Sequence, residues 1–290
     1  MSADSAGAVS TGRRSWRRFR RNSTAVIGLA IVVVVVLAAL FAPWIAPYPD
    51  HVGAVVNFRA RHQPPSLHFW FGTDDVGRDI LTRILFGYRI SLILAATVLV
   101  IAVPFGVTLG LVAGYFGGWT ETIVMRLTDV ALAIPPLVMA LAVTTVLTPN
   151  LIHSMLAIAA LWWTWHTRLI FSITRTLSQQ EFIEAARTLG ASRFHILFRE
   201  LLPNCASAIF VKTSLDFGFV ILVGAALSYL GLGVQPPTPD LGTMVASGAD
   251  FLPDRWWESL IPGAAILFVA LGFNLLGDGL RDLYDVESVR

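Results

Sequence analysis

One apolar segment near the N-terminus constrains the fold more than any other feature of the chain. Residues 25–42 are all apolar or glycine, and the run ends at Pro43. A helix needs roughly 20 such residues to cross the hydrocarbon core of a bilayer. Because a backbone inside lipid has to satisfy its own hydrogen bonds, the segment predicts a membrane-spanning helix.

The composition indicates that more membrane helices follow. Hydrophobic residues make up 55% of the chain, charged residues only 14%, and the mean hydropathy is +0.68. A soluble domain carries about 25% charged residues and could not bury this much apolar surface. A cleaved secretory signal is the alternative for the first segment, because arginines such as Arg13 and Arg14 precede it. The apolar segments downstream favour a retained anchor.

Five further segments have the character of membrane spans. They are residues 90–113, 130–147, 151–170, 209–232 and 259–276. In the first of these, Gly106, Gly110 and Gly114 recur at every fourth position, which predicts a close contact with another helix. The pair Pro135-Pro136 predicts a kink in the second.

The segment 151–170 is the most polar of the five. The residues that interrupt it are His153, Ser154, Thr164, His166 and Thr167. We still expect it to span the membrane. Its tryptophans, Trp162, Trp163 and Trp165, predict that the second half ends at the membrane interface.

Six spans place both termini on one side of the membrane, and the basic residues predict which side. Under this topology 15 Lys and Arg residues lie on the side of the termini and six on the other. The six are Arg59, Arg61, Arg78, Arg83, Arg89 and Arg255. Because basic residues accumulate in cytoplasmic segments, we expect both termini in the cytoplasm. The predicted fold class is an all-α polytopic membrane protein with six transmembrane helices.

This topology divides the chain into consecutive parts. The parts are a basic cytoplasmic tail (1–24), the first transmembrane helix (25–46), an extracytoplasmic loop (47–89), a core of five transmembrane helices (90–285) and a cytoplasmic C-terminal tail (286–290). The core contains a long cytoplasmic loop at 172–204.

The sequence lacks the common signatures of catalysis. A phosphate-binding loop needs Gly-Lys-Ser/Thr, and the one lysine of the chain, Lys212, follows Val211. Neither a zinc-protease motif nor a hydrolase nucleophile motif occurs. An intramembrane aspartyl hydrolase is an open alternative, because Asp129, Asp216 and Asp278 lie at or just inside the ends of predicted spans. Helix caps and ion pairs account for such acids more often.

The loop between the fourth and fifth spans carries the most informative pattern, and we call residues 178–203 the elbow. Ser178 and Glu181 have the spacing of a capping box. A helix should therefore begin at Ser178 and end at Gly190, since glycine commonly terminates helices.

A second helix should follow at once within the elbow. Ser192 can cap it, and Pro203 should end it. Its apolar face consists of Phe194, Leu197, Phe198, Leu201 and Leu202. Such a face either seats in the groove of a partner or packs on the protein's own bundle, and the periodicity leaves both open.

Two motifs in the elbow carry a family resemblance. They are Glu184-Ala185-Ala186 followed by Gly190, and Leu201-Leu202-Pro203-Asn204. Both resemble the EAA loop of binding-protein-dependent ABC importer permeases, which inserts into the cleft of the ATPase subunit. The stretches 71–79, 114–119, 227–237 and 274–282 are similar to the C-type permease subunit of dipeptide, oligopeptide and nickel importers. The similarity covers roughly residues 25–285.

The resemblance implies the type I ABC importer (MetI-like) permease fold, in the cytoplasmic (inner) membrane of a bacterium. It also implies that the elbow couples the chain to an ATPase. The coupling residues are then Glu184, Ala185, Ala186, Arg187, Gly190, Leu201 and Pro203. The chain itself would not be an enzyme and would hold no cofactor, because ATP and Mg would be bound by partner ATPase subunits.

The same resemblance supplies the expected partners. They are a homologous second permease, two ATPase subunits or one fused ATPase, an extracytoplasmic substrate-binding protein and the lipid bilayer, with no nucleic acid. The two permeases would form the pathway for dipeptides or oligopeptides. Candidate pathway residues are Asp216, Ser228 and Asn274, because polar groups at bilayer depth face protein or water. Helix packing is an equal alternative for them. A nickel-type importer is the other transport hypothesis, supported only by His153 and His166.

At two positions the chain departs from the family pattern. Glu200 stands where members often carry histidine before Ile-Leu-Pro, and Gly224 where they often carry an acid. The first departure bears on the docking partner. The second leaves fewer fixed charges in the fifth span.

Overall fold

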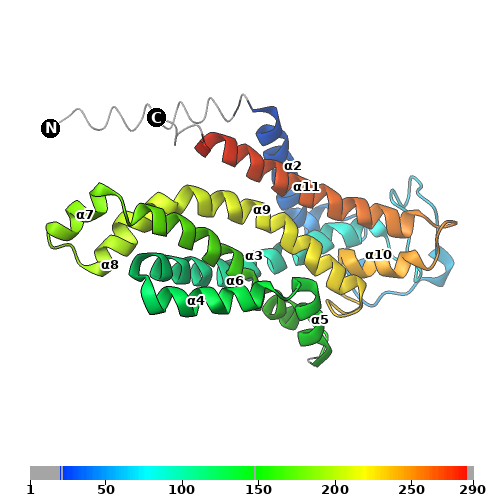
Figure 1. The fold of residues 1–290 in the computed structure, drawn as a ribbon. Coiled ribbons are helices and arrows are strands. Elements are labelled where there is room, and N and C mark those ends of the chain that lie inside the picture. The colour runs from blue at the N-terminus through cyan, green and yellow to red at the C-terminus, as the bar shows by residue number, and fades with distance from the viewer. Residues whose placement is uncertain (1–19, 21, 147, 286–290) are drawn as a thin grey trace.

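The computed structural model describes residue 20, residues 22–146 and residues 148–285, and these are helices joined by loops (Figure 1). The helices are α2 (Ser23–Ile45), η1 (Pro49–Val52), η2 (Phe58–Ala60), α3 (Ile80–Phe116), α4 (Gly118–Leu132), α5 (Pro136–Val146), α6 (Leu151–Leu177), α7 (Glu181–Thr188), α8 (Arg193–His195), η3 (Ile196–Leu201), α9 (Leu202–Tyr229), α10 (Leu241–Ala249) and α11 (Trp257–Asp285). The predicted all-α fold is confirmed. Most of the basic tail and the tail 286–290 lie outside the described residues.

The number of membrane crossings agrees only roughly with the predicted six. Four described stretches are long and apolar enough to cross a bilayer, namely α2, α3, the continuous stretch from α8 through α9, and α11. A fifth crossing results if α4 and α5 form one broken span. α6 has the length of a span, with 27 residues, but more polar side chains.

The predicted third span is broken rather than kinked. α4 ends at Leu132, α5 begins at Pro136, and the two helices meet at 82°. Pro135 disfavours a helical conformation in the residue before it, while proline at the first position of a helix costs no hydrogen bond. The prediction of one helix over 130–147 is therefore wrong, although the proline pair marks the break.

The glycine stripe of α3 packs directly on α6, as its spacing predicts. A Cβ atom at Gly106 would lie 2.3 Å from the carbonyl oxygen of Trp163, and one at Gly110 would lie 2.7 Å from that of Thr167. Only glycine permits backbones to approach so closely. α6 continues beyond its tryptophans, and Trp162 is buried inside the bundle. The predicted interfacial end at these tryptophans is therefore wrong.

The beginning of α2 meets the end of α11. The side-chain amide of Asn22, which caps α2, donates a hydrogen bond to Asp282 Oδ2 at 2.8 Å. The helices cross closely, since a Cβ atom at Gly28 would lie 2.4 Å from the backbone nitrogen of Leu276. In Figure 1 the elbow lies at the left end of the bundle, and α11 runs toward that end.

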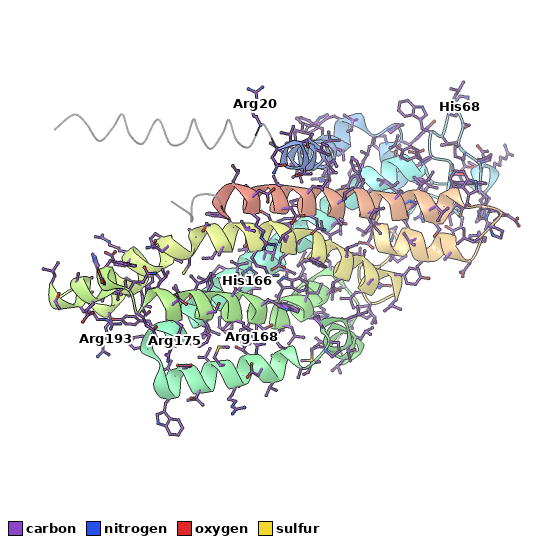
Figure 2. All side chains as sticks on the ribbon, turned by 45° about the horizontal axis from the view of Figure 1, so that its top comes forward. Arg20, His68, His166, Arg168, Arg175 and Arg193 are labelled. Atoms are coloured by element: carbon purple, nitrogen blue, oxygen red, sulfur yellow. The ribbon has the colours of Figure 1, made fainter. Side chains whose placement is uncertain are left out.

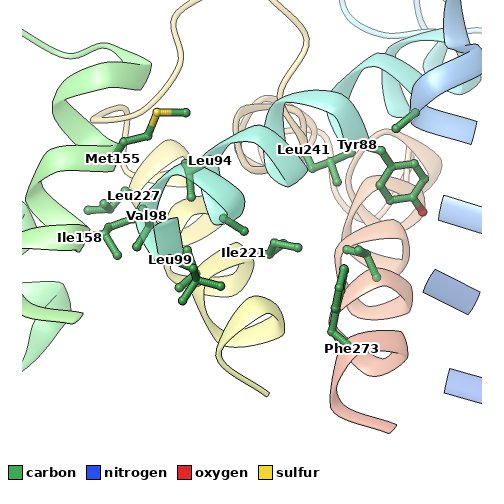
Figure 3. Packing of buried hydrophobic residues seen from close by; sticks show 14 of the residues in the cluster. Tyr88, Leu94, Val98, Leu99, Met155, Ile158, Ile221, Leu227, Leu241 and Phe273 are labelled. Carbon is green, nitrogen blue, oxygen red and sulfur yellow. The ribbon is translucent and has the colours of Figure 1, made fainter. Parts of the chain in front are cut away.

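The opposite end of the bundle is formed by residues 47–79 together with α10, and we call this part the collar (Figure 1). Between elbow and collar, one apolar core joins α3, α6, α9, α10 and α11. Figure 3 shows part of it: Leu94, Val98, Leu99, Ile158, Ile221, Leu227 and Leu241. Lipid provides no hydrophobic drive between helices, so tight packing of these side chains holds the bundle together.

Candidate functional site

The first helix of the elbow begins three residues later than predicted. α6 extends to Leu177, and Ser178 caps its C-terminal end, with its backbone N–H donating to the carbonyl of Thr174. α7 starts at Glu181 after Gln180, whose side chain makes no capping bond. The capping-box prediction is wrong because the preceding membrane helix runs on through Ser178.

Gly190 ends α7 as predicted. Its φ angle is +83°, and its backbone N–H donates a hydrogen bond to the backbone carbonyl of Arg187 at 3.0 Å. The N–H of Ala191 donates to the carbonyl of Ala186, also at 3.0 Å. This pair of bonds is the Schellman motif, which needs a left-handed residue at the position of Gly190. No neighbour lies within 4 Å of a Cβ atom placed there, so the backbone conformation alone requires glycine.

The second helix of the elbow begins as predicted but does not end at Pro203. Ser192 Oγ accepts a hydrogen bond from the N–H of His195 at 3.2 Å. The chain then passes through the π-helical segment η3 into α9 without interruption, and Pro203 is the second residue of α9. A proline is tolerated near a helix start, and the wider π turn before it absorbs the irregularity. The predicted end at Pro203 is therefore wrong.

The elbow has two faces of opposite character. On the inner face, Ile183 and Leu201 are fully buried against residues of α3 and α6. On the outer face, Leu189 is 87% exposed and Phe194 is 71% exposed, and the ring of Phe194 lies tilted against that of Phe198 at 4.5 Å between centroids. The inner face packs on the protein's own bundle, as one interpretation of the apolar pattern expected. The outer face is uncovered, as the other interpretation, a face that seats in a partner's groove, requires.

The predicted coupling residues fall on both faces. Glu184, Ala185, Arg187, Gly190 and Pro203 are exposed; Ala186 is half-buried, and Leu201 is buried. The guanidinium of Arg187 lies over the ring of Tyr115 at 5.0 Å, which attaches α7 to the end of α3. This contact helps to position the elbow relative to the long helix α3.

Of the predicted pathway residues, Asp216 lines a cavity between two helices. Its carboxylate accepts a hydrogen bond from Lys212, and its Oδ2 lies 3.6 Å from His166 Nε2 of α6. Together with Trp162, Trp165 and Phe219, Asp216 and Lys212 line a cavity of about 200 Å³ between α6 and α9. Figure 2 shows His166 between these two helices.

Ser228 and Asn274 lie elsewhere, at helix contacts. A Cβ atom at Gly242 of α10 would lie 2.8 Å from Ser228 Cβ, and Asn274 Nδ2 donates to the carbonyl of Ala270 on its own helix at 3.0 Å. The structure does not bring either residue to the cavity that Asp216 lines. Their part in a pathway stays a prediction.

Sequence reasoning did not predict the cavity residues Trp162, Trp165, Lys212 and Phe219, nor His166 beside Asp216. Lys212 stands four residues before Asp216 within an apolar segment, and this spacing of opposite charges is a readable signal. His166 and Trp162 approach from α6, some 50 residues earlier in the chain, and no local pattern indicates that.

The three aspartates of the hydrolase hypothesis have different environments. Asp129 of α4 pairs with Arg168 of α6, Asp216 pairs with Lys212, and Asp278 is exposed on α11. Among the described residues, no three His, Cys, Asp or Glu side chains gather as metal ligands would. These three aspartates therefore do not form the facing pair of carboxylates that the hydrolase hypothesis needs.

The collar is held by buried polar contacts. His62 Nδ1 lies 2.6 Å from Glu258 Oε1, and Asp74 Oδ2 accepts from Arg78 Nε at 2.7 Å. The backbone N–H of Asp79 donates to His51 Nδ1 at 2.9 Å. Burial lowers the pKa of His51, which favours the neutral ring that this bond requires.

Asp79 begins α3 by capping it. Its Oδ2 accepts a hydrogen bond from the N–H of Thr82 at 2.7 Å. Burial raises the pKa of the Asp79 carboxyl, and this effect outweighs the lowering by its hydrogen bonds. The motif 71–79 therefore connects the collar to α3 and caps the start of that helix.

The structure shows the surroundings of Glu200 and Gly224, the two positions at which the chain departs from the family pattern. Glu200 Oε1 lies 3.4 Å from His195 Nε2 within the elbow. A Cβ atom at Gly224 would lie 2.9 Å from the side chain of Leu94, so this position faces α3 inside the bundle. An acidic side chain at position 224 would therefore lie against the apolar core of this chain.

The described helices form a polytopic bundle with an exposed elbow, and the family models identify such a chain as a membrane permease subunit. The family model described as "Binding-protein-dependent transport system inner membrane component" matches residues 106–286, and that of the "N-terminal TM domain of oligopeptide transport permease C" matches residues 10–65. The chain belongs to the first of these families. Its members are permease subunits of ABC importers and not enzymes, because their ATPase partners hydrolyse ATP.

Curated relatives resemble the chain over most of its length. It is 41% identical to the dipeptide transport system permease protein DppC of Alkalihalophilus pseudofirmus, over 96% of this chain and 90% of that protein. It is 40% identical to the di/tripeptide transport system permease protein DppC of Pseudomonas aeruginosa, over 93% and 90%. It is also 40% identical to the glutathione transport system permease protein GsiD of Escherichia coli, over 93% and 88%.

Proposed function

We propose that this chain imports dipeptides or oligopeptides as one of two homologous permease subunits that together enclose the translocation pathway. The relatives that support this proposal are named for dipeptides, for di- and tripeptides, and for glutathione, itself a peptide. The nickel alternative has little support, because His153 bonds to the carbonyl of Thr148 at 2.6 Å and His166 lies beside Asp216.

The observation that carries the proposal is the uncovered outer face of the elbow. A soluble surface that exposes Leu189 and Phe194 beside a glycine hinge is unfavourable unless a partner covers it. An amphipathic helix laid into the groove of a partner is a recurring mode of recognition. The proposed occupant is the ATPase, present as two subunits or one fused chain, which binds the ATP and Mg.

The proposed orientation puts the elbow and both termini in the cytoplasm and the collar outside. The excess of basic residues on the side of the termini supports it, as does the meeting of α2 and α11 through Asn22 and Asp282. The substrate-binding protein then delivers peptide at the collar end.

The helix connectivity suggests how the elbow acts on the pathway. The stretch Arg193–Tyr229 is one continuous helix of 37 residues, which joins the outer face of the elbow to the cavity at Asp216. A rigid helix moves as a unit, so displacement of its elbow end by ATPase closure tilts the cavity wall. Two discrete arrangements of such helices produce alternating access.

The test is reconstitution of the full importer in proteoliposomes. Peptide uptake should require ATP, the binding protein and both permeases, whereas nickel should not accumulate. The purified chain alone should hydrolyse neither ATP nor peptides. Accumulation of nickel without peptide would contradict the proposed substrate.

A further inference from the structure

One loop of the collar exposes apolar side chains at its tip, and we call residues 66–70 the tip loop. Leu67 is 96% exposed and Trp70 is 66% exposed. The backbone N–H of Ser66 donates to the carbonyl of Phe69 at 2.8 Å, and the N–H of Phe69 donates to Ser66 Oγ at 3.1 Å. Such bonds fix the shape of a turn, so the backbone itself holds Leu67 away from the rest of the protein.

Tyr48 attaches the tip loop to the end of the first membrane helix. Its hydroxyl donates to the carbonyl of His68 at 2.9 Å, and its ring lies 5.1 Å from the ring of Phe69 between centroids. Tyr48 stands three residues after Ile45, where α2 ends. In Figure 2, His68 lies at the collar end, on the side of the bundle where α2 runs. The tip loop therefore lies at the level at which α2 leaves the membrane.

Exposed side chains on α2 and α11 mark where the hydrocarbon core ends at the collar. The last two turns of α2 expose Phe41, Trp44 and Ile45, and Trp44 is 76% exposed. Trp256 is exposed directly before α11, and Leu260 is exposed one turn later. Lipid covers the exposed apolar side chains of a spanning helix, and tryptophan is enriched where lipid meets water. Trp44 and Trp256 therefore indicate the level of the membrane interface.

We propose that the tip loop contacts the bilayer surface, with Leu67 and Trp70 inserted among the lipids of the leaflet at the collar end. Trp70 then joins Trp44 and Trp256 in one aromatic belt. The contact continues the lipid-facing surface of α2, to which Tyr48 holds the loop. It is independent of the transported substrate.

Charge and hydrophobicity both favour lipid as the occupant. Residues 51–73 contain no acidic side chain but include Arg59, Arg61 and His68, so the phosphates of lipid headgroups meet no like charge there. Transfer of the Leu67 side chain from water into lipid is favourable. A substrate-binding protein is the other candidate, but it would have to displace lipid beside α2 in order to cover the loop.

Fluorescence of a probe on the tip loop tests the lipid contact in the assembled importer. Leu67→Cys is labelled with a nitrobenzoxadiazole fluorophore; Cys205 is buried, and the partner subunits are made free of exposed cysteine. In nanodiscs with doxyl-labelled lipids, we expect the emission to fall about threefold relative to unlabelled lipids. A thiol at headgroup level is still reached by water-soluble reagents from outside, so Leu67→Cys also reacts with impermeant reagents.

Two further positions calibrate the quenching. Val36→Cys, at an exposed valine near the middle of α2, should be quenched at least as strongly. Ser247 of α10 is exposed at a cavity that Asp75 and Arg78 also line. Because charged groups do not face lipid, Ser247→Cys should be quenched by less than about 1.2-fold.

A matched pair of substitutions assigns the contact to the tip loop. Trp70→Ser should reduce lipid quenching at position 67 about twofold, since it removes one of the two inserted side chains. Trp119→Ser, at a tryptophan that is 84% exposed at the start of α4, should leave the quenching unchanged. Equal quenching in these two variants would overturn the insertion of Trp70.

Two other results would overturn the lipid contact itself. One is quenching of position 67 by aqueous iodide and not by doxyl-labelled lipids, with or without the substrate-binding protein, which would leave the tip loop in water. The other is shielding of position 67 from iodide only after the substrate-binding protein is added. That result would make the tip loop a docking surface for the binding protein.

Discussion

The elbow and the collar lie at opposite ends of one bundle. The elbow exposes apolar side chains, whereas the collar pairs charged side chains with each other or with neighbouring helices. In the elbow, Leu189 and Phe194 are 87% and 71% exposed. In the collar, His62 is bonded to the Glu258 carboxylate of α11, which is 2% exposed, and Asp74 is bonded to Arg78. The ion pairs of the collar are made within the chain, whereas the outer face of the elbow is left uncovered by the chain. Substitutions in the collar should therefore reduce stability, and substitutions on the outer face of the elbow should reduce coupling.

The largest effect is expected where the collar contacts α11. Glu258→Ala removes the carboxylate that His62 contacts and leaves a buried polar ring unpaired, which costs about 2 kcal/mol of stability. We expect the Tm of the purified complex to fall by several degrees, since about 1 kcal/mol corresponds to roughly 2–4 °C in a chain of this size. Glu181→Ala, at an exposed glutamate of the elbow, is the control and should not change Tm. Equal Tm values for the two variants would remove the contrast.

The next effect concerns the hinge of the elbow. Gly190→Val places a β-branched residue at φ +83°, where L-residues pay about 1–2 kcal/mol. We expect ATP-driven uptake to fall about tenfold while insertion and pairing with the second permease persist. Gly190→Asn is the matched variant, because asparagine tolerates this conformation, and it should retain most uptake. Wild-type uptake in Gly190→Val would make the elbow a simple connector.

A smaller effect is expected on the outer face of the elbow. Leu189→Ser removes an exposed leucine side chain that the ATPase would bury, which is worth about 1 kcal/mol or roughly a fivefold loss of ATPase affinity. The Tm of the permease pair alone should not change. Affinity is measured by titrating the ATPase onto the permease pair in nanodiscs. An unchanged Kd would show that the ATPase contacts another surface.

The smallest effect is a pH dependence in the collar. Burial lowers the pKa of His51 below its ordinary 6.5, against the carboxylates of Asp50, Asp74 and Asp79 that raise it and alongside Arg78 that lowers it. The unfolded segment then binds a proton before the folded one, so the stabilisation is present above pH 6.5 and is lost as the pH falls below it. The protection factor of amides at the start of α3, which corrects for the slower intrinsic exchange at low pH, should fall about threefold on acidification, and His51→Asn should abolish this response.

The sequence predicted the features that depend on local chemistry. The spacing of Gly106, Gly110 and Gly114 was sufficient to predict a close contact with another helix, and the structure shows that this helix is α6. Gly190 was predictable because the end of a helix so often needs a left-handed residue. The resemblance of the elbow to the EAA loop depends on residues that are mostly exposed, where packing does not dictate the choice of side chain.

Predictions failed where a neighbouring element overrode a local signal. Ser178 has the spacing of an N-cap, but the packing of α6 against α3 carries that helix past it. Proline usually disfavours the continuation of a helix, but at Pro203 the preceding π-helical segment lets the chain continue into α9. The contact of His166 with Asp216 joins two helices far apart in the chain, and only the fold shows it.

Cysteine cross-linking compares the two ends of the molecule most directly. In the importer, Leu189→Cys on the elbow should cross-link to a cysteine in the ATPase cleft and resist impermeant thiol reagents applied from outside. Leu67→Cys in the collar, a position that is 96% exposed, should react with those reagents and not with the ATPase. The buried Cys205 gives no background in either case. Cross-linking of the ATPase to position 67, or external labelling of position 189, would contradict the account.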